Sequence, residues 1–217
     1  MLGCALALAL AAGSASAVSF QLDIASSTYQ VGAGDTWADL IAQHQSETLL
    51  SSTTVTSVAG ISAPLYAGVN QNYSMLIRTD LDVTLSGTYA FQVGTDWGRG
   101  GVAVVIDNAT SSVIDELVRT DDIWWNNSWS NPDVFVTSIA LTAGESYTVA
   151  WLGFEGCCGG SAEIRFSYDG APFQTLSQSS IASYATPEPG SALLFGLGLG
   201  GLAGGRRGRW GGADLRD

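Results

Sequence analysis

The chain of 217 residues contains no Lys and a single His, His44, and this scarcity excludes several kinds of chemistry. With one His there is no helical His-Glu-x-x-His zinc site. A Ser-His-Asp triad would have to use His44, and no nucleophile-elbow motif accompanies that residue. The sequence therefore favours a protein that is not an enzyme. One enzymatic alternative stays open, a glycan-acting hydrolase using paired carboxylates, because acids are plentiful and none is singled out.

Basic residues and cysteines are also scarce. Residues 18–186 hold four Arg against seventeen Asp or Glu, which gives a net charge of −13. Such a body repels nucleic acid and anionic membranes, so no nucleic-acid partner is expected. Cys157 and Cys158 are the only cysteines in this part of the sequence, and as neighbours they cannot staple distant segments. The aromatic content is high for so few charges, which excludes a disordered spacer.

The C-terminal segment 187–209 combines three features in a fixed order. They are Pro187, Glu188 and Pro189, an apolar run over 191–205, and Arg206, Arg207 and Arg209. Cations just past an apolar segment stay cytoplasmic, which puts the preceding body on the outer side of a membrane. The segment resembles the PEP-CTERM sorting signal of Gram-negative bacteria. That resemblance implies a transient inner-membrane intermediate, cleavage by an exosortase-type transpeptidase, and delivery to the outer surface or the extracellular matrix. Residues 210–217 would form a short cytoplasmic tail.

The N-terminal end also carries an export pattern. Residues 2–12 are apolar, and Ala15-Ser16-Ala17 is a small-x-small cleavage site, with Ala15 and Ala17 as its small residues. We therefore expect a signal peptide over 1–17 and a mature chain that begins at Val18. Between the two signals we expect one domain over 18–174, large enough for a core, followed by a Ser-rich linker over 175–186.

Periodicity predicts one helix and several strands. Within 35–50, Trp37, Leu40, Ile41 and His44 follow helical spacing, with Thr36 and Asp39 in a capping-box relation. Apolar residues alternate over 89–93, 147–151 and 164–168, whereas 102–106 is a continuous apolar run typical of a strand buried on both faces. Gly, Asn and Asp turn signals separate these stretches. The fold class predicted is all-β, an antiparallel, jelly-roll-like β-sandwich with one short N-terminal helix.

Two stretches of the body resemble the protective-antigen-type β-sandwich. The stretch SGTYAFQVGTDWGRGGVAVVID (86–107) is similar to its central hairpin, and LTAGESYTVAWLGFEG (141–156) is similar to a later strand. The hairpin pattern falls on Gly87, Tyr89, Phe91, Asp96, Gly98 and Asp107. The resemblance implies glycan binding, in some relatives through Ca²⁺ held by adjacent Asp residues. In this chain Trp97 stands where the second Asp of that pair would be.

The stretch GFEGCCGG (153–160) resembles the Cys-Cys-x-Gly mark of a family of PEP-CTERM exported proteins, through Cys157, Cys158 and Gly160. Neighbouring Cα atoms lie about 3.8 Å apart, closer than the roughly 4.4 Å that ordinary disulfides need. The flanking glycines would allow the unusual backbone angles of a bond between these two cysteines. Three interpretations stay open: a structural turn, a redox-responsive pair, and thiols that bond other chains or a metal.

One polar and aromatic cluster, TDDIWWNNSWSNPD (120–133), is the candidate binding segment. Its candidate residues are Asp121, Asp122, Trp124, Trp125, Asn126, Asn127 and Trp129. Indole faces stack on sugar rings and amides bond hydroxyls, while carboxylates with amide oxygens also suit Ca²⁺. The alternative is that the indoles plug one end of the sandwich. The function predicted is a non-catalytic surface or exopolysaccharide-matrix protein that needs no cofactor, with affinity for glycan or Ca²⁺.

Overall fold

Short strands with alternating burial form two antiparallel sheets in the computed structural model, which describes residues 18–186. The larger sheet is ordered β2 (Thr48–Val55), β1 (Phe20–Ser26), β4 (Tyr73–Val83), β10 (Ser146–Glu155), β6 (Gly101–Asp107), β7 (Ser112–Arg119), with β13 (Ala185–Thr186) also paired to β4. The smaller sheet is ordered β12 (Gln174–Thr175), β11 (Ser161–Tyr168), β5 (Gly87–Trp97), β8 (Ile123–Trp124), with β3 (Ile61–Ser62) paired to β11 and β9 (Phe135–Leu141) to β5. Three helices complete the described chain: α1 (Trp37–Ser46), α2 (Ala63–Ala67) and α3 (Gln178–Ile181).

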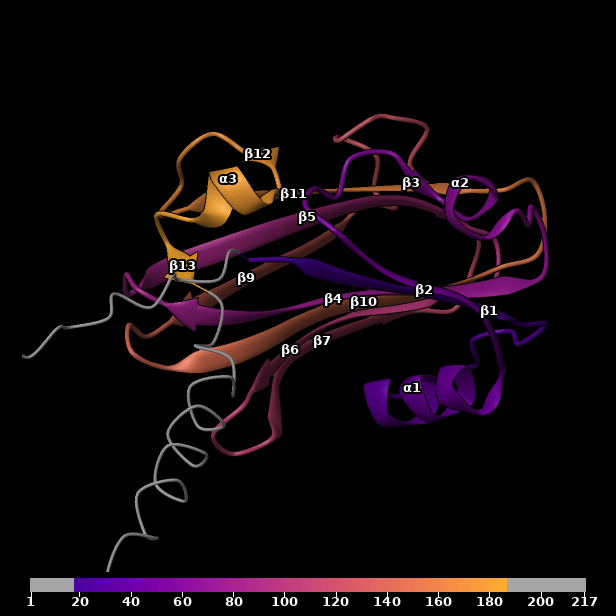
Figure 1. Cartoon of the computed structure of the whole chain (residues 1–217), viewed down its shortest axis with the longest axis horizontal. Helices are drawn as coiled ribbons and strands as arrows, with labels where there is room; N and C mark the ends of the chain where they lie inside the picture. Colours follow the sequence, from indigo (N-terminus) through magenta and orange to yellow (C-terminus); the bar gives the residue numbers. More distant parts are fainter. Residues whose placement is uncertain (1–17, 187–217) are drawn as a thin grey trace, which may run out of the picture.

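The two sheets pack face to face around one apolar core, as Figure 1 shows. Alternate residues of β5, namely Tyr89, Phe91 and Val93, are at most 1% exposed and face this core. The ring of Phe91 meets that of Trp151 from β10 across the interface, with centroids 5.8 Å apart. Burial of such rings contributes roughly 25 cal/mol per Å² of apolar area. The prediction of an antiparallel β-sandwich is confirmed.

The outer face of the larger sheet carries α1, which lies across it in Figure 1. Leu40 of α1 is fully buried in a second apolar cluster with Val102 and Val104 of β6. The intervening Ala103 and Val105 belong to the core between the sheets. The strand over 102–106 is therefore buried on both faces, as its continuous apolar run predicts.

The start of α1 agrees with the sequence and its end does not. Thr36 is the N-cap, and its capping box with Asp39 is present. The expected helix over 35–50 nevertheless ends at Ser46, and Thr48–Val55 is strand β2. The hydroxyl-rich and β-branched residues of β2 favour a strand, and β1 supplies its antiparallel partner.

The expected linker over 175–186 is wrong, because this segment belongs to the domain. Leu176, Ile181 and Ala185 are fully buried in the main core, and β13 pairs with the end of β4. Its hydroxyls do not form a flexible spacer, since Ser177 and Ser180 form the capping box of α3. The signal peptide (1–17), the sorting signal (187–209) and the tail (210–217) lie outside the described residues. Within 18–186, no helix is long and apolar enough to cross a membrane.

Candidate functional site

A short ladder between β5 and β8 places one aromatic and one acidic side chain side by side at the end of the sandwich. Asp96 pairs with Trp124, and Trp97 pairs with Ile123. Successive side chains of a strand point to opposite faces, and directly paired residues share a face. Trp97 and Ile123 are buried in the core, so Asp96 and Trp124 face outward. The side chain of Trp124 is 55% exposed.

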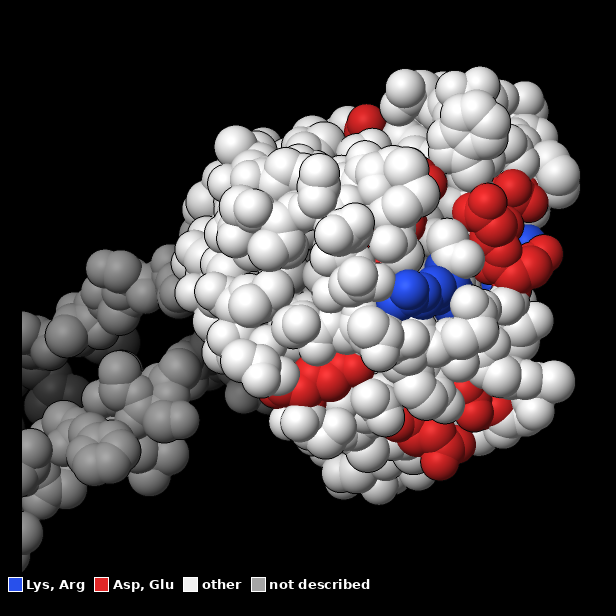
Figure 2. All heavy atoms as spheres, turned by 90° about the vertical axis from the view of Figure 1, so that its right-hand side faces the viewer, with Lys and Arg blue, Asp and Glu red and all other residues white. Residues whose placement is uncertain are grey.

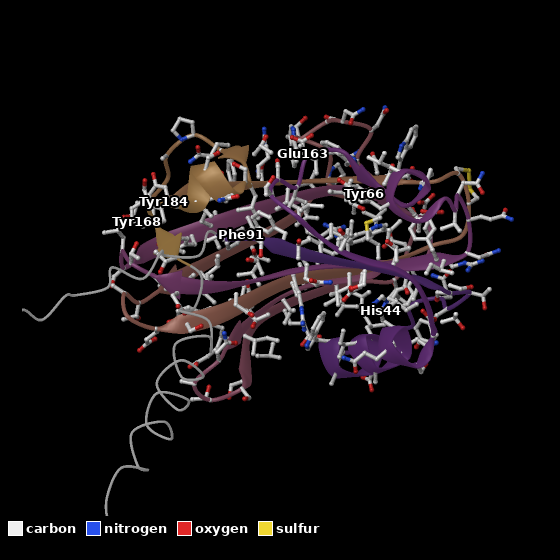
Figure 3. The ribbon with its side chains drawn as sticks, in the orientation of Figure 1. His44, Tyr66, Phe91, Glu163, Tyr168 and Tyr184 are labelled. Atoms are coloured by element: carbon white, nitrogen blue, oxygen red, sulfur yellow. A yellow bond between two sulfur atoms is a disulfide. The ribbon has the colours of Figure 1, made fainter. Side chains whose placement is uncertain are left out.

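A disulfide between neighbouring residues, Cys157 and Cys158, follows β10 at the same end of the molecule. Figure 3 shows it as a yellow bond at the end of the sandwich opposite Tyr168 and Tyr184. Both cysteines are exposed. Cys158 has a φ of 71° and Gly159 a φ of 69°, so the backbone makes a left-handed turn here. In this structure the two cysteines are bonded to each other, as a structural turn or a redox-responsive pair requires, and not to another chain or a metal.

The glycine of the Cys-Cys-x-Gly motif has a definite packing reason. A Cβ on Gly160 would lie 2.1 Å from the carbonyl oxygen of Asp96, which is closer than real contacts allow. Gly160 therefore lets the disulfide turn lie directly against the end of β5. The same contact brings Cys157 and Cys158 next to Asp96 and Trp124.

A buried carboxylate joins the two loops. Glu155 is 2% exposed, and its two oxygens accept hydrogen bonds from Gly98 N at 2.6 Å and Cys157 N at 2.6 Å. Hydrogen bonds from backbone amides to an ionised carboxylate are stronger than neutral ones. Glu155 thus fixes the β5–β6 turn relative to the disulfide turn.

These elements enclose a cleft of about 320 Å³. Its lining residues are Asp96, Gly98, Asp122, Trp124, Glu155, Cys157 and Cys158. Burial first, and then the charges of Glu155 and Asp122, raise the pKa of Asp96 above its usual range. Figure 2 shows this end of the molecule, where red acidic groups lie in patches around a smaller blue basic one. The cleft presents negative charge next to an indole ring and a disulfide.

The aromatic segment 120–133 divides between this cleft and the outer face of the smaller sheet. Asp122 and Trp124 line the cleft. Trp125 is 3% exposed and lies so close over β5 that a Cβ on Gly94 would meet its ring at 2.3 Å. Trp129 is only partly buried, in contact with Trp125 at a centroid distance of 4.5 Å. Trp125 and Trp129 therefore neither line the cleft nor plug the core between the sheets, because they cover the outer face of β5.

The remaining predicted residues of this segment do not line the cleft. Asp121, Asn126 and Asn127 are exposed, and both asparagines adopt positive φ in a turn. Asn131 supports the site indirectly, because its amide donates to the carbonyl oxygen of Trp124 at 2.9 Å. The sequence analysis named Asp96 and Gly98 only as positions of the hairpin pattern, and it did not single out Glu155. The available signal for Glu155 was a carboxylate two residues before the paired cysteines.

A calcium ion does not fit the cleft. Among residues 18–186 no group of three or more His, Cys, Asp or Glu side chains is placed to hold a metal ion. The position of the second adjacent Asp is taken by Trp97, whose side chain is 1% exposed in the core. A Cβ on Gly153 would lie 1.9 Å from that ring, which shows how tightly the ring is held.

His44 belongs to a buried hydrogen-bond network. Its Nδ1 lies 2.7 Å from Ser74 Oγ, and that hydroxyl donates to Glu47 at 2.8 Å. Ser74 is fully buried, and its proton is directed to the carboxylate, so it is not placed as a nucleophile. Figure 3 shows His44 where α1 faces the larger sheet. Burial lowers the pKa of His44, which favours the neutral ring.

No protein-family model matches the chain, and no curated protein matches it. Its fold is similar to the PA14 sugar-binding domain from an RTX adhesin, with 11% identity and a TM-score of 0.48 over 79% of this chain and 99% of that chain. The epithelial adhesin 6 A domain from Candida glabrata, in complex with Galb1-3GlcNAc, gives 12% identity and a TM-score of 0.46 over 77% of this chain and 86% of that chain. The PA14 domain of the MpAFP antifreeze protein gives 11% identity and a TM-score of 0.48 over 77% of this chain and 89% of that chain. These values are low, so the function proposed below is derived from the cleft.

Proposed function

We propose that the protein is a non-catalytic glycan-binding protein of the cell surface or the exopolysaccharide matrix, and that the cleft beside Trp124 is its binding site. The observation that carries this proposal is an indole that is 55% exposed at the rim of a cleft of about 320 Å³. That volume falls at the lower end of small-ligand sites, which occupy roughly 300–1,000 Å³. An exposed indole offers a flat apolar face on which a sugar ring stacks.

The architecture supports binding by a rigid site. Trp124 and Asp96 sit on paired strands, the disulfide restrains the opposite wall, and Glu155 joins the two loops through backbone amides. A pre-organised site loses little conformational freedom when the ligand enters. In contrast, nothing in the cleft resembles an activated nucleophile, which favours binding over catalysis.

A glycan array with and without added Ca²⁺ tests this function. We expect binding that does not require Ca²⁺, because the lining residues do not form a calcium site. Trp124→Ala should abolish binding without unfolding the protein. Val136→Ala is a matched control, since Val136 is similarly exposed at 53% and does not line the cleft. Absence of any glycan binding by the wild type would refute the proposal.

We further propose that the chain is exported and sorted by an exosortase-type transpeptidase through Pro187, Glu188, Pro189, Arg206, Arg207 and Arg209. Within residues 18–186 the last strand is β13, which ends at Thr186, and the Pro-Glu-Pro motif follows it directly in the sequence. The intact mass of protein recovered from culture tests this proposal. A mature chain from Val18 to the Pro-Glu-Pro is expected, whereas a species that still ends at Asp217 would contradict it.

A redox-responsive role is a second candidate, favoured by the exposed disulfide in the wall of the cleft. Reduction of Cys157 and Cys158 would release the turn that Gly160 holds against β5. Glycan binding measured with and without a thiol reductant, followed by reoxidation, tests this role. A reversible loss of affinity is expected, and unchanged affinity after complete reduction would rule it out.

A further inference from the structure

The cleft offers a ligand only one kind of polar side chain. Its polar lining side chains are the carboxylates of Asp96, Asp122 and Glu155, with no Asn, Gln, Ser or Thr among them. No Arg lines it, and the chain contains no Lys. An ionised carboxylate only accepts hydrogen bonds, whereas a sugar hydroxyl both donates and accepts. The cleft therefore matches a ligand group that only donates.

No basic side chain of residues 18–186 lines the cleft beside its carboxylates. Asp96 is partly buried, and its carboxylate receives no hydrogen bond from residues 18–186. Glu155 is buried and engaged by Gly98 N and Cys157 N, which are neutral donors. The nearby Arg99 is directed elsewhere, since its guanidinium donates to Ser27 O and Asn72 Oδ1. Burial and like charges raise the pKa of Asp96, in agreement with a missing counter-charge.

The indole lies directly beside this charge. Asp96 and Trp124 are cross-strand partners on the same outward face of the β5–β8 ladder. A cation near the face of an indole is attracted by the ring, and the apolar face of a sugar stacks on the same surface. A ligand that joins an ammonium group to a sugar ring would satisfy Asp96 and Trp124 together.

We propose that the ligand of this cleft is an unacetylated amino sugar, whose protonated amine is held by Asp96 and Glu155 while its ring stacks on Trp124. This inference rests on the proposed glycan-binding function and names its ligand class. An ammonium group has three donors and no acceptor, which matches the carboxylate lining. It also needs no fixed coordination geometry, in contrast to the calcium ion that these residues do not fit. An N-acetylated sugar has a neutral amide at the same position. The amide carries no charge and adds a carbonyl acceptor, so it matches the carboxylate lining less well.

Isothermal titration with two matched probes tests the inference. The probes are the β-1,4-linked glucosamine tetramer and its fully N-acetylated counterpart, compared near neutral pH and at low salt. We expect the wild type to bind the unacetylated tetramer at least about tenfold more tightly, which corresponds to roughly 1.4 kcal/mol. Added salt should weaken this preference, because the interaction is between charges.

Three variants separate local recognition from general attraction. Asp96→Asn should remove the preference for the amine, and Trp124→Ala should weaken binding of both tetramers. Asp115→Asn is the charge-matched control, since Asp115 lies on β7, is also partly exposed and does not line the cleft. It should keep the preference of the wild type. Thermal melting of each variant checks that it is folded.

Four results would overturn the inference. Equal affinity for the two tetramers, or an equal loss in Asp96→Asn and Asp115→Asn, would show that no local amine site exists. Equally tight binding of a lysine-rich peptide of the same length and charge would show that the sugar ring is not recognised. Binding of neutral glycans through Trp124 without any amine preference would leave the proposed function intact and refute this inference alone. Failure of both tetramers, together with an empty glycan array, would refute both.

Discussion

The two ends of the sandwich are finished in different ways. At one end Tyr89, Tyr168 and Tyr184 pack against one another, with ring centroids 5.2 and 4.8 Å apart along that chain of contacts. The hydroxyl of Tyr89 donates to Leu85 O and Tyr184 O, and that of Tyr168 donates to Ser86 O. At the other end, Trp124 is exposed and the carboxylate of Asp96 receives no hydrogen bond from residues 18–186. We call the first end closed, because its hydroxyl groups have hydrogen-bond partners, and the second end open, because an indole is exposed there.

The largest effect on stability is expected at the open end, where Trp125 is buried and Trp124 is exposed. Trp125→Ala should lower the free energy of unfolding by about 3–5 kcal/mol, because the ring is buried over Gly94 and leaves a cavity. Trp124→Ala should cost less than about 1 kcal/mol, since its ring faces solvent. Denaturant unfolding of both variants measures the difference. Similar costs for the two would mean that the open end is not divided in this way.

The next largest effect on stability is expected where the disulfide turn packs against β5. Gly160→Ala should lower the free energy of unfolding by about 1–3 kcal/mol, because its new Cβ would clash with the carbonyl oxygen of Asp96. Ligand binding should be lost as well, since the wall of the cleft moves. Gly156→Ala is the control, because a Cβ there first meets the Arg99 side chain at 3.1 Å and that side chain is able to shift. Denaturant unfolding and titration of both variants test the prediction, and equal costs would contradict it.

A smaller effect is expected at the closed end. Tyr89→Phe removes the hydroxyl that donates to Leu85 O and Tyr184 O, so it should cost about 1 kcal/mol of stability. Ligand binding should not change, because this residue lies at the opposite end of the sandwich. Denaturant unfolding and titration of the same sample check both parts. A change in affinity would show that the two ends are coupled.

The smallest effect has the opposite sign. The pKa of Asp96 is raised in the folded protein by burial, Glu155 and Asp122, so the ionised group destabilises the fold. This penalty is present above the raised pKa and is relieved as the pH falls through it. Asp96→Asn should therefore stabilise the free protein near neutral pH, by less than about 1 kcal/mol because solvent screens the partly exposed group.

Thermal melts across a pH series measure this last difference. The gain in Asp96→Asn should shrink as the pH is lowered, because the wild-type carboxyl then becomes neutral as well. A gain that does not vary with pH would mean that charge is not its cause. Loss of the amine preference in a more stable variant would show that the open end carries charge for binding and not for folding.

Local patterns predicted the parts of the fold that depend on local physics. The capping box of Thr36 and Asp39 and the two-sided burial of 102–106 follow from neighbouring residues and are confirmed. The end of the helix was predicted wrongly, because pairing of Thr48–Val55 with β1 overrides the apparent periodicity. The Ser-rich composition of 175–186 concealed the apolar side chains that anchor this segment in the core.

The site was only half predictable, because it depends on contacts between distant segments. The sequence indicated the segment of Trp124 and the paired cysteines separately. Only the packing of Gly160 against Asp96 brings them together. Trp124 is exposed whereas Trp125 is buried. This difference depends on the register of the short β5–β8 pairing, which no local pattern reveals. Glu155 is recognised as a site residue only through its hydrogen bonds with two loops, and no sequence pattern indicates those bonds.

The placement of β13 has a mechanical consequence if the chain is tethered through its C-terminus. The described residues end at Thr186 in β13, beside Val83 and Asp82 of β4, at the end of the sandwich opposite the disulfide (Figure 1 and Figure 3). A ligand held in the cleft and a tether attached at Thr186 would then pull on opposite ends of the sandwich. A pull on Thr186 would first load the short pairing of β13 with β4, which is backed by the buried side chains of Ile181 and Ala185. The same topology that separates the anchor from the cleft would keep a tether at Thr186 from obstructing a ligand in the cleft.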